Sequence, residues 1–261
     1  TEGANQTISQ SITDRAGNTT NATSSPAVNV DLTAPINVAG TPDRTPDSNG
    51  WYNHQVNVTF SGQDTVSGIA SCTTSSYSGP DNASASVAGS CTDLAGNSTS
   101  GSFALAYDAT APTIVYSGNQ GSYDITATVT ITCTASDNLS GVATTDCQNI
   151  SAPAYTFAVG SNTVSSSVTD VAGNTAGGSV TFTITESADS LTTLTKQFVS
   201  NPTLARQLSA PLGGIALANR INSPSMKQAY LNVYIMLVNQ QRGRALTNQE
   251  ADTLIRLAKG L

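Results

Sequence analysis

The 261-residue sequence has few charged side chains, few aromatic side chains and no long hydrophobic run. Charged residues make up 10% of the chain and aromatic residues 5%, whereas about 25% charged is usual for soluble proteins. No apolar run approaches the roughly 18 residues of a membrane span, so we predict no membrane span. A first Met, a basic leader and a secretory hydrophobic segment are also lacking. We therefore expect a mature product or a fragment.

Motifs for catalysis are missing as well. There is no Gly-x-Ser-x-Gly elbow, no phosphate-binding glycine loop and no dinucleotide fingerprint. His54 is the single histidine, and its local sequence offers neither a nucleophile nor an acidic partner. Spacing alone leaves paired carboxylates for glycoside hydrolysis open, but the acidic residues recur at equivalent places, which favours a role in folding. The sequence predicts a protein that is not an enzyme.

The charge changes sign along the chain. Residues 1–185 have no Lys and only Arg15 and Arg44 against 13 acidic residues, a net charge of −11. Residues 186–261 contain eight cations and four acids, a net charge of +4. Such a change indicates a domain boundary. We expect no nucleic-acid binding by the acidic part, because it has almost nothing to neutralise phosphates.

Three short motifs repeat in the same order. Asp-x-Ala-Gly-Asn occurs at residues 14–18, 93–97 and 170–174. Asp-x-Thr-Ala-Pro occurs at 31–35 and 108–112, and Asp-x-x-Ser-Gly at 64–68 and 137–141. The spacings of 73 to 79 residues suit one small domain per repeat.

Within the repeats, apolar and polar residues alternate with a period of two, which is typical of strands with one buried face. The alternating apolar positions are Val56, Val58 and Phe60, then Ile125, Ala127, Val129, Ile131 and Cys133, then Val180, Phe182 and Ile184. Turn residues separate these segments without a helical pattern between them. The predicted fold is mainly β, with tandem antiparallel β-sandwiches.

These motifs resemble the tandem bacterial Ig-like repeats of large secreted and surface proteins over residues 1–185. The string Asn49-Gly50-Trp51-Tyr52-Asn53 fits the same repeat type. Residues 1–33 match only the second half of a repeat. The predicted domains are therefore a half repeat at 1–33, Ig-like repeats at 34–110 and 111–185, and a helical bundle at 186–261.

The four cysteines fall as two in each complete repeat. Because each repeat contains an even number of cysteines that lie close together in the sequence, we expect disulfides Cys72–Cys91 and Cys133–Cys147. Reduced core thiols and a zinc site are the alternatives. Disulfides would place the protein outside the cell or at its surface.

The last 75 residues have a helical period. Asn201-Pro202 and Ser223-Pro224 are helix starts, Pro211 should kink or split its helix, and Thr247–Glu250 is a capping box. Met226, Tyr230, Val233 and Leu237 recur at helical spacing and are expected in the core. The segment 188–261 resembles the FIMAH domain, a small C-terminal helical module of bacterial extracellular proteins, which implies no known chemistry.

Calcium is the alternative to a turn-capping role for the repeated acids, because hard cations take carboxylate and carbonyl oxygens together. Some Ig-like adhesins bind calcium at domain linkers, as the resemblance implies. The candidate ligands are Asp14, Asp31, Asp93, Asp108 and Asp170. No other cofactor is expected.

The cationic residues of the helical part are candidates for binding an anionic surface polysaccharide: Arg206, Arg220, Lys227, Arg242, Arg244, Arg256 and Lys259. Three functions fit the sequence. The first is a non-catalytic extracellular structural or adhesive region with Ig-like spacers and a helical tip or anchor. The second is the accessory C-terminal region of a secreted enzyme, and the third is a filament subunit assembled through strand edges. The expected partners are neighbouring domains of a longer chain or copies of the protein.

Overall fold

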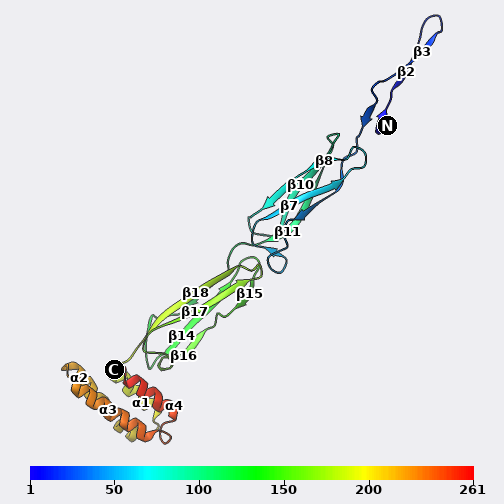
Figure 1. Ribbon diagram of the computed structural model, residues 1–261. Helices are drawn as coiled ribbons and strands as arrows, with labels where there is room; N and C mark the ends of the chain where they lie inside the picture. Colours follow the sequence, from blue (N-terminus) through cyan, green and yellow to red (C-terminus); the bar gives the residue numbers. More distant parts are fainter. The chain divides into compact units, whose positions relative to one another are not determined.

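The computed structural model describes all 261 residues and consists of strands followed by four helices (Figure 1). The chain forms two compact units. The first comprises Thr1–Ala111, Asp137–Ala143 and Thr169–Asn174, and the second Pro112–Ser136, Thr144–Val168 and Thr175–Leu261. The predicted fold class, Ig-like β-sandwiches followed by a small helical part, is confirmed.

Residues 1–33 form two separate strand pairs. Strand β1 (Gly3–Gln6) pairs with β4 (Val28–Val30), and β2 (Ser9–Thr13) pairs with β3 (Thr19–Thr23). Strands β2 and β3 are exposed throughout, and Ile8 and Ile12 keep 70% and 63% of their surface accessible. Two strands cannot bury an apolar face by themselves.

The first sandwich has one four-stranded and one three-stranded sheet, with strand orders β6-β11-β10-β8 and β5-β7-β9. Its core contains the alternating Val56, Val58 and Phe60, as predicted, together with Ala85, Val87, Leu105, Tyr52 and Tyr107. The strands are β5 (Ile36–Pro42), β6 (Trp51–Tyr52), β7 (Val56–Gln63), β8 (Ile69–Cys72), β9 (Thr74–Tyr77), β10 (Asn82–Asp93) and β11 (Ser98–Tyr107). All pairs are antiparallel except β6–β11.

The second sandwich repeats this plan with strand orders β12-β14-β16 and β13-β18-β17-β15. Its strands are β12 (Thr113–Ser117), β13 (Ser122–Asp124), β14 (Thr128–Ser136), β15 (Val142–Thr145), β16 (Ile150–Pro153), β17 (Gly160–Asp170) and β18 (Thr175–Thr185), with a short 3-10 helix at Ala154–Thr156. The short strand β13 again pairs in parallel with the last strand, β18. The alternating segment that begins at Ile125 is not one strand, because residues 125–127 connect β13 to β14.

The helices are α1 (Ala188–Phe198), α2 (Pro202–Arg220), α3 (Pro224–Gln241) and α4 (Asn248–Ala258). The predicted starts are present: the Asn201 side chain caps α2, and Thr247 and Glu250 form a reciprocal capping box on α4. Helix α2 continues through Pro211, so the expected split does not occur. The pairs α1–α2, α2–α3, α3–α4 and α1–α4 are in contact.

The helices share a hydrophobic core with the second sandwich. One apolar cluster includes Ile131 and Phe182 of the sheets and Leu191 and Leu254 of the helices. The Arg256 guanidinium of α4 donates to the backbone carbonyls of Tyr155 and Phe157. These contacts join the helices and the sandwich inside the second compact unit.

The expected buried face of α3 is wrong in part: Leu237 packs against the core, but the face is centred on other residues. Tyr234 and Val238 are fully buried, and the Tyr234 hydroxyl lies 2.8 Å from Thr195 Oγ1. Tyr230 and Val233 keep 37% and 42% of their surface exposed. The pattern could not select the face because residues 230–238 are apolar except for Asn232, so more than one helical stripe could serve as the core.

Candidate functional site: two carboxylate clusters

Each Asp-x-Ala-Gly-Asn string forms the same closed turn between two strands. In all three copies the Asp Oδ1 accepts from the Asn backbone N–H, and its Oδ2 accepts from the Asn side-chain amide, at 2.8 to 2.9 Å. The glycine takes φ values of 91°, 96° and 93°, a region that favours glycine. In the first copy, the Asn18 side-chain amide and its backbone N–H hold the pKa of Asp14 below its ordinary value. The acids of these strings are therefore turn caps.

The Asp-x-x-Ser-Gly strings form a second type of capped loop. Asp64 Oδ1 accepts from the N–H groups of Val66, Ser67 and Gly68 at 3.1, 2.9 and 2.7 Å. Asp137 Oδ1 accepts in the same way from Leu139 and Gly141, at 3.0 and 2.8 Å. No protein group donates a hydrogen bond to Oδ2 of either carboxylate, so one oxygen of each is available to a further partner.

The linker that enters each sandwich is held by both types of loop of that sandwich. Asp31 Oδ2 accepts from the Ser67 N–H at 3.1 Å, and the Asn97 side-chain amide donates to the carbonyls of Asp31 and Thr33. The second copy has the corresponding bonds: Asp108 Oδ2 accepts from Ser140 at 3.1 Å. The Asn174 amide donates to the carbonyls of Asp108 and Thr110 at 2.9 and 3.3 Å. The three motifs therefore act together.

This arrangement gathers three carboxylates at the entrance to each sandwich. Oxygen atoms of Asp31, Asp64 and Asp93 lie within 4.8 Å of one another, and so do those of Asp108, Asp137 and Asp170. Asp93, Asp108 and Asp170 are almost completely buried, at 2%, 0% and 1% exposure. No Lys or Arg side chain is paired with either cluster. Carboxylates this close repel one another unless a cation lies between them.

Four of the five predicted calcium ligands therefore lie in the two clusters. The exception is Asp14, whose carboxylate meets only its own turn and joins no other acid. Sequence reasoning missed Asp64 and Asp137 as candidate ligands. Their signal was present in the repeated Asp-x-x-Ser-Gly string, which was interpreted only as evidence for the repeat.

The donor set of each cluster suits a hard divalent cation. Calcium takes six to eight oxygen ligands from carboxylates, carbonyls and water, and each cluster offers three carboxylates. Nitrogen and sulfur ligands for a softer metal are lacking, since the lone His54 lies elsewhere and all four cysteines are bonded to one another. Asp64 and Asp137 would supply the oxygens that no protein group occupies.

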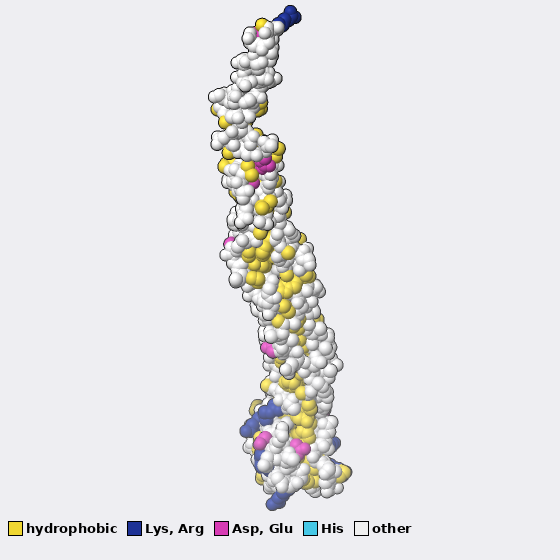
Figure 2. Space-filling model, turned by 90° about the vertical axis from the view of Figure 1, so that its right-hand side faces the viewer, with side chains coloured by type: hydrophobic (Ala, Val, Ile, Leu, Met, Phe, Trp, Pro, Cys, Tyr) yellow, Lys and Arg dark blue, Asp and Glu magenta, His cyan; other side chains and the backbone are white.

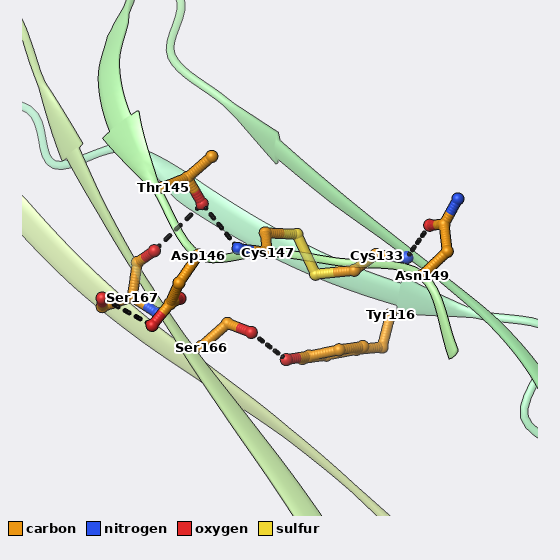
Figure 3. Close-up of a disulfide and its surroundings, with 8 residues drawn as sticks. All are labelled: Tyr116, Cys133, Thr145, Asp146, Cys147, Asn149, Ser166 and Ser167. Carbon is orange, nitrogen blue, oxygen red and sulfur yellow. Dashed lines mark hydrogen bonds between the residues drawn. A yellow bond between two sulfur atoms is a disulfide. The ribbon is translucent and has the colours of Figure 1, made fainter. Parts of the chain in front are cut away.

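Both predicted disulfides are present, Cys72–Cys91 and Cys133–Cys147. The first joins directly opposed residues of paired strands β8 and β10. The second joins β14 to the loop after β15 (Figure 3). Asn149 Oδ1 accepts from the Cys133 N–H and Thr145 Oγ1 from the Cys147 N–H, at 2.9 and 3.0 Å. The loop is thus fixed on both sides of the sulfur bridge.

Three of the predicted polymer-binding cations make contacts within the protein. Lys227 donates to the Leu261 carbonyl, Arg242 pairs with Asp252 at 2.6 Å, and Arg256 is bound to backbone carbonyls. Arg206, Arg220, Arg244 and Lys259 are exposed and make no side-chain hydrogen bond. On the face shown in Figure 2, Lys and Arg side chains gather mainly over the helices. Internal contacts therefore occupy three of the seven predicted residues.

His54 lies on a polar loop of the first sandwich, and the expectation that it has no acidic partner nearby in the sequence is wrong. Its Nδ1 is 3.3 Å from Asp47 Oδ1, and Asp47 also accepts from both terminal nitrogens of Arg44 at 2.7 Å. The hydrogen bonds from Arg44 lower the pKa of Asp47. The loop is thus organised around an Arg–Asp pair, with the histidine ring on its solvent side.

Comparison with known proteins identifies no family. No family model and no curated protein matches the sequence. The solved fibronectin(III)-like modules of Clostridium thermocellum CbhA share 12% identity over 57% of this chain and 95% of theirs, with a TM-score of 0.25.

Two further likenesses are to cadherin structures. Extracellular cadherin domains 1–5 of protocadherin gamma B2 give 8% identity, 70% and 52% coverage of this chain and of that chain, and a TM-score of 0.30. The protocadherin gammaB4 extracellular domain shares 9% identity with this chain. The match covers 71% of this chain and 43% of that chain, with a TM-score of 0.33. The chain spans about half the length of these two structures or less. Likenesses at these TM-scores carry no argument about this chain, whose fold is established by its own sheets.

Proposed function

We propose that this chain is a non-catalytic, extracellular structural region of a larger bacterial surface or secreted protein. The two sandwiches act as spacers, and the helical part is a tip or anchor. The observation that carries this proposal is the repeated fixation of the entry linkers. Asp31 and Asp108 are each held by two loops of the next sandwich along the chain, through corresponding hydrogen bonds. A linker held in this way transmits tension instead of extending freely.

The linker at 108–110 has bonds on its other side as well. The Asp108 N–H donates to the Tyr52 carbonyl at 2.9 Å, and the Ala109 N–H donates to Asp81 Oδ1 at 2.9 Å. These residues and both loops that hold Asp108 belong to the first compact unit. The linker therefore forms hydrogen bonds with Tyr52 of β6 and with Asp81. These are in addition to its bonds with the two loops that hold Asp108.

Strand topology supports a load-bearing role. In each sandwich the last strand pairs in parallel with a short strand from the first half, β11 with β6 and β18 with β13. Tension applied between the ends of a sandwich shears such a pair, so its hydrogen bonds must break together. An antiparallel terminal hairpin would open one bond at a time.

Composition and covalent links support an extracellular location. Both disulfides need an oxidising compartment to persist. Residues 45–195 contain no Lys or Arg, so proteases that cut after basic residues have Arg44 as their single site within the two sandwiches. These features suit a protein exposed to extracellular proteases.

Force spectroscopy on the full chain, tethered by its two ends, tests the spacer role. Two unfolding events are expected, one for each sandwich. The disulfides span 19 and 14 residues. Reduction should therefore lengthen the two events by about 60 Å and about 45 Å, at roughly 3.5 Å per residue less the 4.1 Å and 5.6 Å between the Cα atoms of each bridge.

Asn97→Ala and Asn174→Ala should each lower one of the two unfolding forces. The matched control is Asn18→Ala, whose amide bonds only its own turn, and it should leave both forces unchanged. Extension of the chain without resolved unfolding events would contradict a load-bearing role.

We infer calcium as the ligand of the two carboxylate clusters. Three observations support this inference. Oxygens of three acids lie close together in each cluster, and two acids of the second cluster and one of the first are buried. The Oδ2 atoms of Asp64 and Asp137 accept no hydrogen bond from the protein. A bound divalent cation would replace carboxylate repulsion by attraction and fix each linker further.

Thermal unfolding in excess calcium and in excess chelator provides the test. Calcium should raise Tm, because a ligand that binds only the folded state stabilises it. Asp64→Asn with Asp137→Asn should keep the loop caps, raise Tm in chelator and reduce the calcium shift. Asp146→Asn, an exposed acid outside both clusters, should retain the full shift. Equal Tm values with calcium and with chelator in the unaltered protein would rule calcium out.

A further inference from the structure

Helices α2 and α3 expose aliphatic side chains on their outer side. We define the α2–α3 patch as Leu217, Ile221, Tyr230, Val233 and Met236, whose exposed fractions are 49%, 58%, 37%, 42% and 51%. Leu217 lies opposite the buried stripe of α2, which contains Leu208, Leu212 and Ile215. Exposed apolar residues that gather in this way mark interaction surfaces.

The patch exists because α3 is apolar on more than one side. Residues 230–238 are apolar except for Asn232, but only Tyr234 and Val238 are fully buried against the rest of the molecule. The Tyr230 ring lies against Gly214 of α2, where an added Cβ would be 2.5 Å from the ring atoms. Tyr230 therefore joins the exposed residues of the two helices across their contact.

The chain segment that forms the patch carries charge of one sign, although Glu186 and Asp189 of the preceding segment line a cavity together with Arg220. Residues 190–249 contain six cations and no Asp or Glu. Arg206 and Arg220 lie on the outer half of α2, are exposed and make no side-chain hydrogen bond. A second copy of the same patch would bring arginines against arginines, so self-association through this face is disfavoured. The surface fits a partner that is both apolar and anionic.

An anionic phospholipid surface combines these two properties. Amphipathic helices lie in a bilayer interface with their apolar side chains among the acyl chains and their cations at the headgroups. Aliphatic residues dominate the patch, which favours acyl chains over sugars.

We propose that the α2–α3 patch binds the surface of an anionic lipid bilayer, with Arg206 and Arg220 at the headgroups. The helices would lie on the bilayer, since none of them is long and apolar enough to cross it. This inference depends on the helices alone and stands whether or not the sandwiches are spacers.

Vesicle co-sedimentation of the full chain tests the proposal. Vesicles of equal phosphatidylglycerol and phosphatidylcholine should bind the protein at 50 mM salt, and binding should fall at 500 mM salt. Pure phosphatidylcholine vesicles should bind at least about tenfold less. Leu217→Asn with Ile221→Asn should reduce binding about tenfold by removing apolar contact. Arg206→Gln with Arg220→Gln should reduce it roughly 30-fold, at about 1 kcal/mol for each charge.

Leu94→Asn is the control, because it alters a leucine in the first sandwich that is more exposed (71%) than Leu217 or Ile221, and binding should not change. Circular dichroism should show full helicity in every variant. Failure to bind anionic vesicles at 50 mM salt would overturn the proposal. Unchanged vesicle binding by the Leu217→Asn, Ile221→Asn variant would overturn it too. A third contrary result is equally tight binding to alginate, because that result would identify an anionic polymer as the partner.

Discussion

The two sandwiches arise from the same repeat, yet only the first completes its core from its own strands. Its buried cluster runs from Tyr52 to Tyr107 and contains residues of that repeat alone. The buried cluster of the second sandwich continues from Tyr123 and Phe182 into helices α1 to α4. Equal sequence motifs therefore specify equal sheets but not equal cores.

The difference lies in the segment that comes after the last strand. After β11, the chain leaves as the linker at Asp108, whose N–H bonds the carbonyl of Tyr52 in β6. After β18, the chain enters α1 within three residues, and the Phe198 ring of α1 packs edge-on against Tyr155, with centroids 5.3 Å apart. The segment after a sandwich thus decides whether its end faces a polar linker or an apolar partner.

Removing a buried helix side chain should give the largest effect and test the shared core. Leu194 in α1 is fully buried, and Leu194→Ala should lower the free energy of unfolding by about 2–5 kcal/mol because it creates a cavity. Hydrogen exchange should show that the second sandwich loses protection together with the helices. Phe60→Ala, in the core of the first sandwich, should leave both unaffected. Normal protection of β14 and β18 in Leu194→Ala would mean that the cores are not coupled.

Removing the disulfides one at a time should sharpen the comparison. In the chain-entropy model, loops of 19 and 14 residues each contribute about 3 kcal/mol. Cys72→Ala with Cys91→Ala should therefore destabilise the first sandwich, and Cys133→Ala with Cys147→Ala the second, by similar amounts. Calorimetry should resolve which transition moves. Movement of both transitions by either pair would show that the sandwiches unfold together.

The linker amides should have a smaller effect. Asn97→Ala removes a side chain that donates to Asp93 Oδ2 and to the carbonyls of Asp31 and Thr33. We expect the free energy of unfolding to fall by about 1–3 kcal/mol, because partly buried acceptors remain unpaired. Asn174→Ala should do the same in the second sandwich. In contrast, Asn18→Ala in the exposed first turn should lower the free energy of unfolding by less than either change, as measured by urea unfolding. An equal decrease would show that the hydrogen bonds to the linkers do not stabilise the sandwiches.

Glu186, between β18 and α1, should make the stability of the second core fall as pH rises. Both carboxylate oxygens are buried without a hydrogen-bond partner, and burial raises the pKa of this group, with Arg256 opposing the shift. The folded state then holds the proton to higher pH than the unfolded state. The resulting stability is complete below the ordinary pKa and is lost as pH rises through the raised pKa.

Glu186→Gln should consequently raise the Tm of the second unit at pH 7 and change it little at pH 4. Asp189→Asn is the control, since Asp189 is exposed in the first turn of α1 and favours the helix when ionised. A Tm of Glu186→Gln below that of the unaltered protein at pH 7 would show that the charged form is the stabilising one.

Local patterns predicted the local structure well. The alternation of Val56, Val58 and Phe60 identified a buried strand face, and Thr247 with Glu250 identified a helix start. The cysteine pairs were predicted from their spacing in the chain. Each of these features depends on residues that are close in sequence or on the repeat that contains them.

Long-range proximity was predictable only in part. Asp31 and Asp93 were identified as candidate ligands, but Asp64 completes their cluster from a third loop that lies between them in sequence. The repeat spacing showed that these loops recur, and only the packing of sheet on sheet showed that three of them meet. The strand expected from Ile125 begins only at Thr128, because residues 125–127 form the turn that connects β13 to β14.

The sequence by itself determined the strands, the turn caps, the disulfide pairs and the change from acidic sandwiches to a cationic helical part. The tertiary structure alone decided which face of α3 is buried, that the helices complete the second core, and that three acids meet at each linker. The physical reason is that turns and alternation depend on neighbours along the chain. A shared core or a carboxylate cluster instead depends on which surfaces remain to be covered once the sheets have formed.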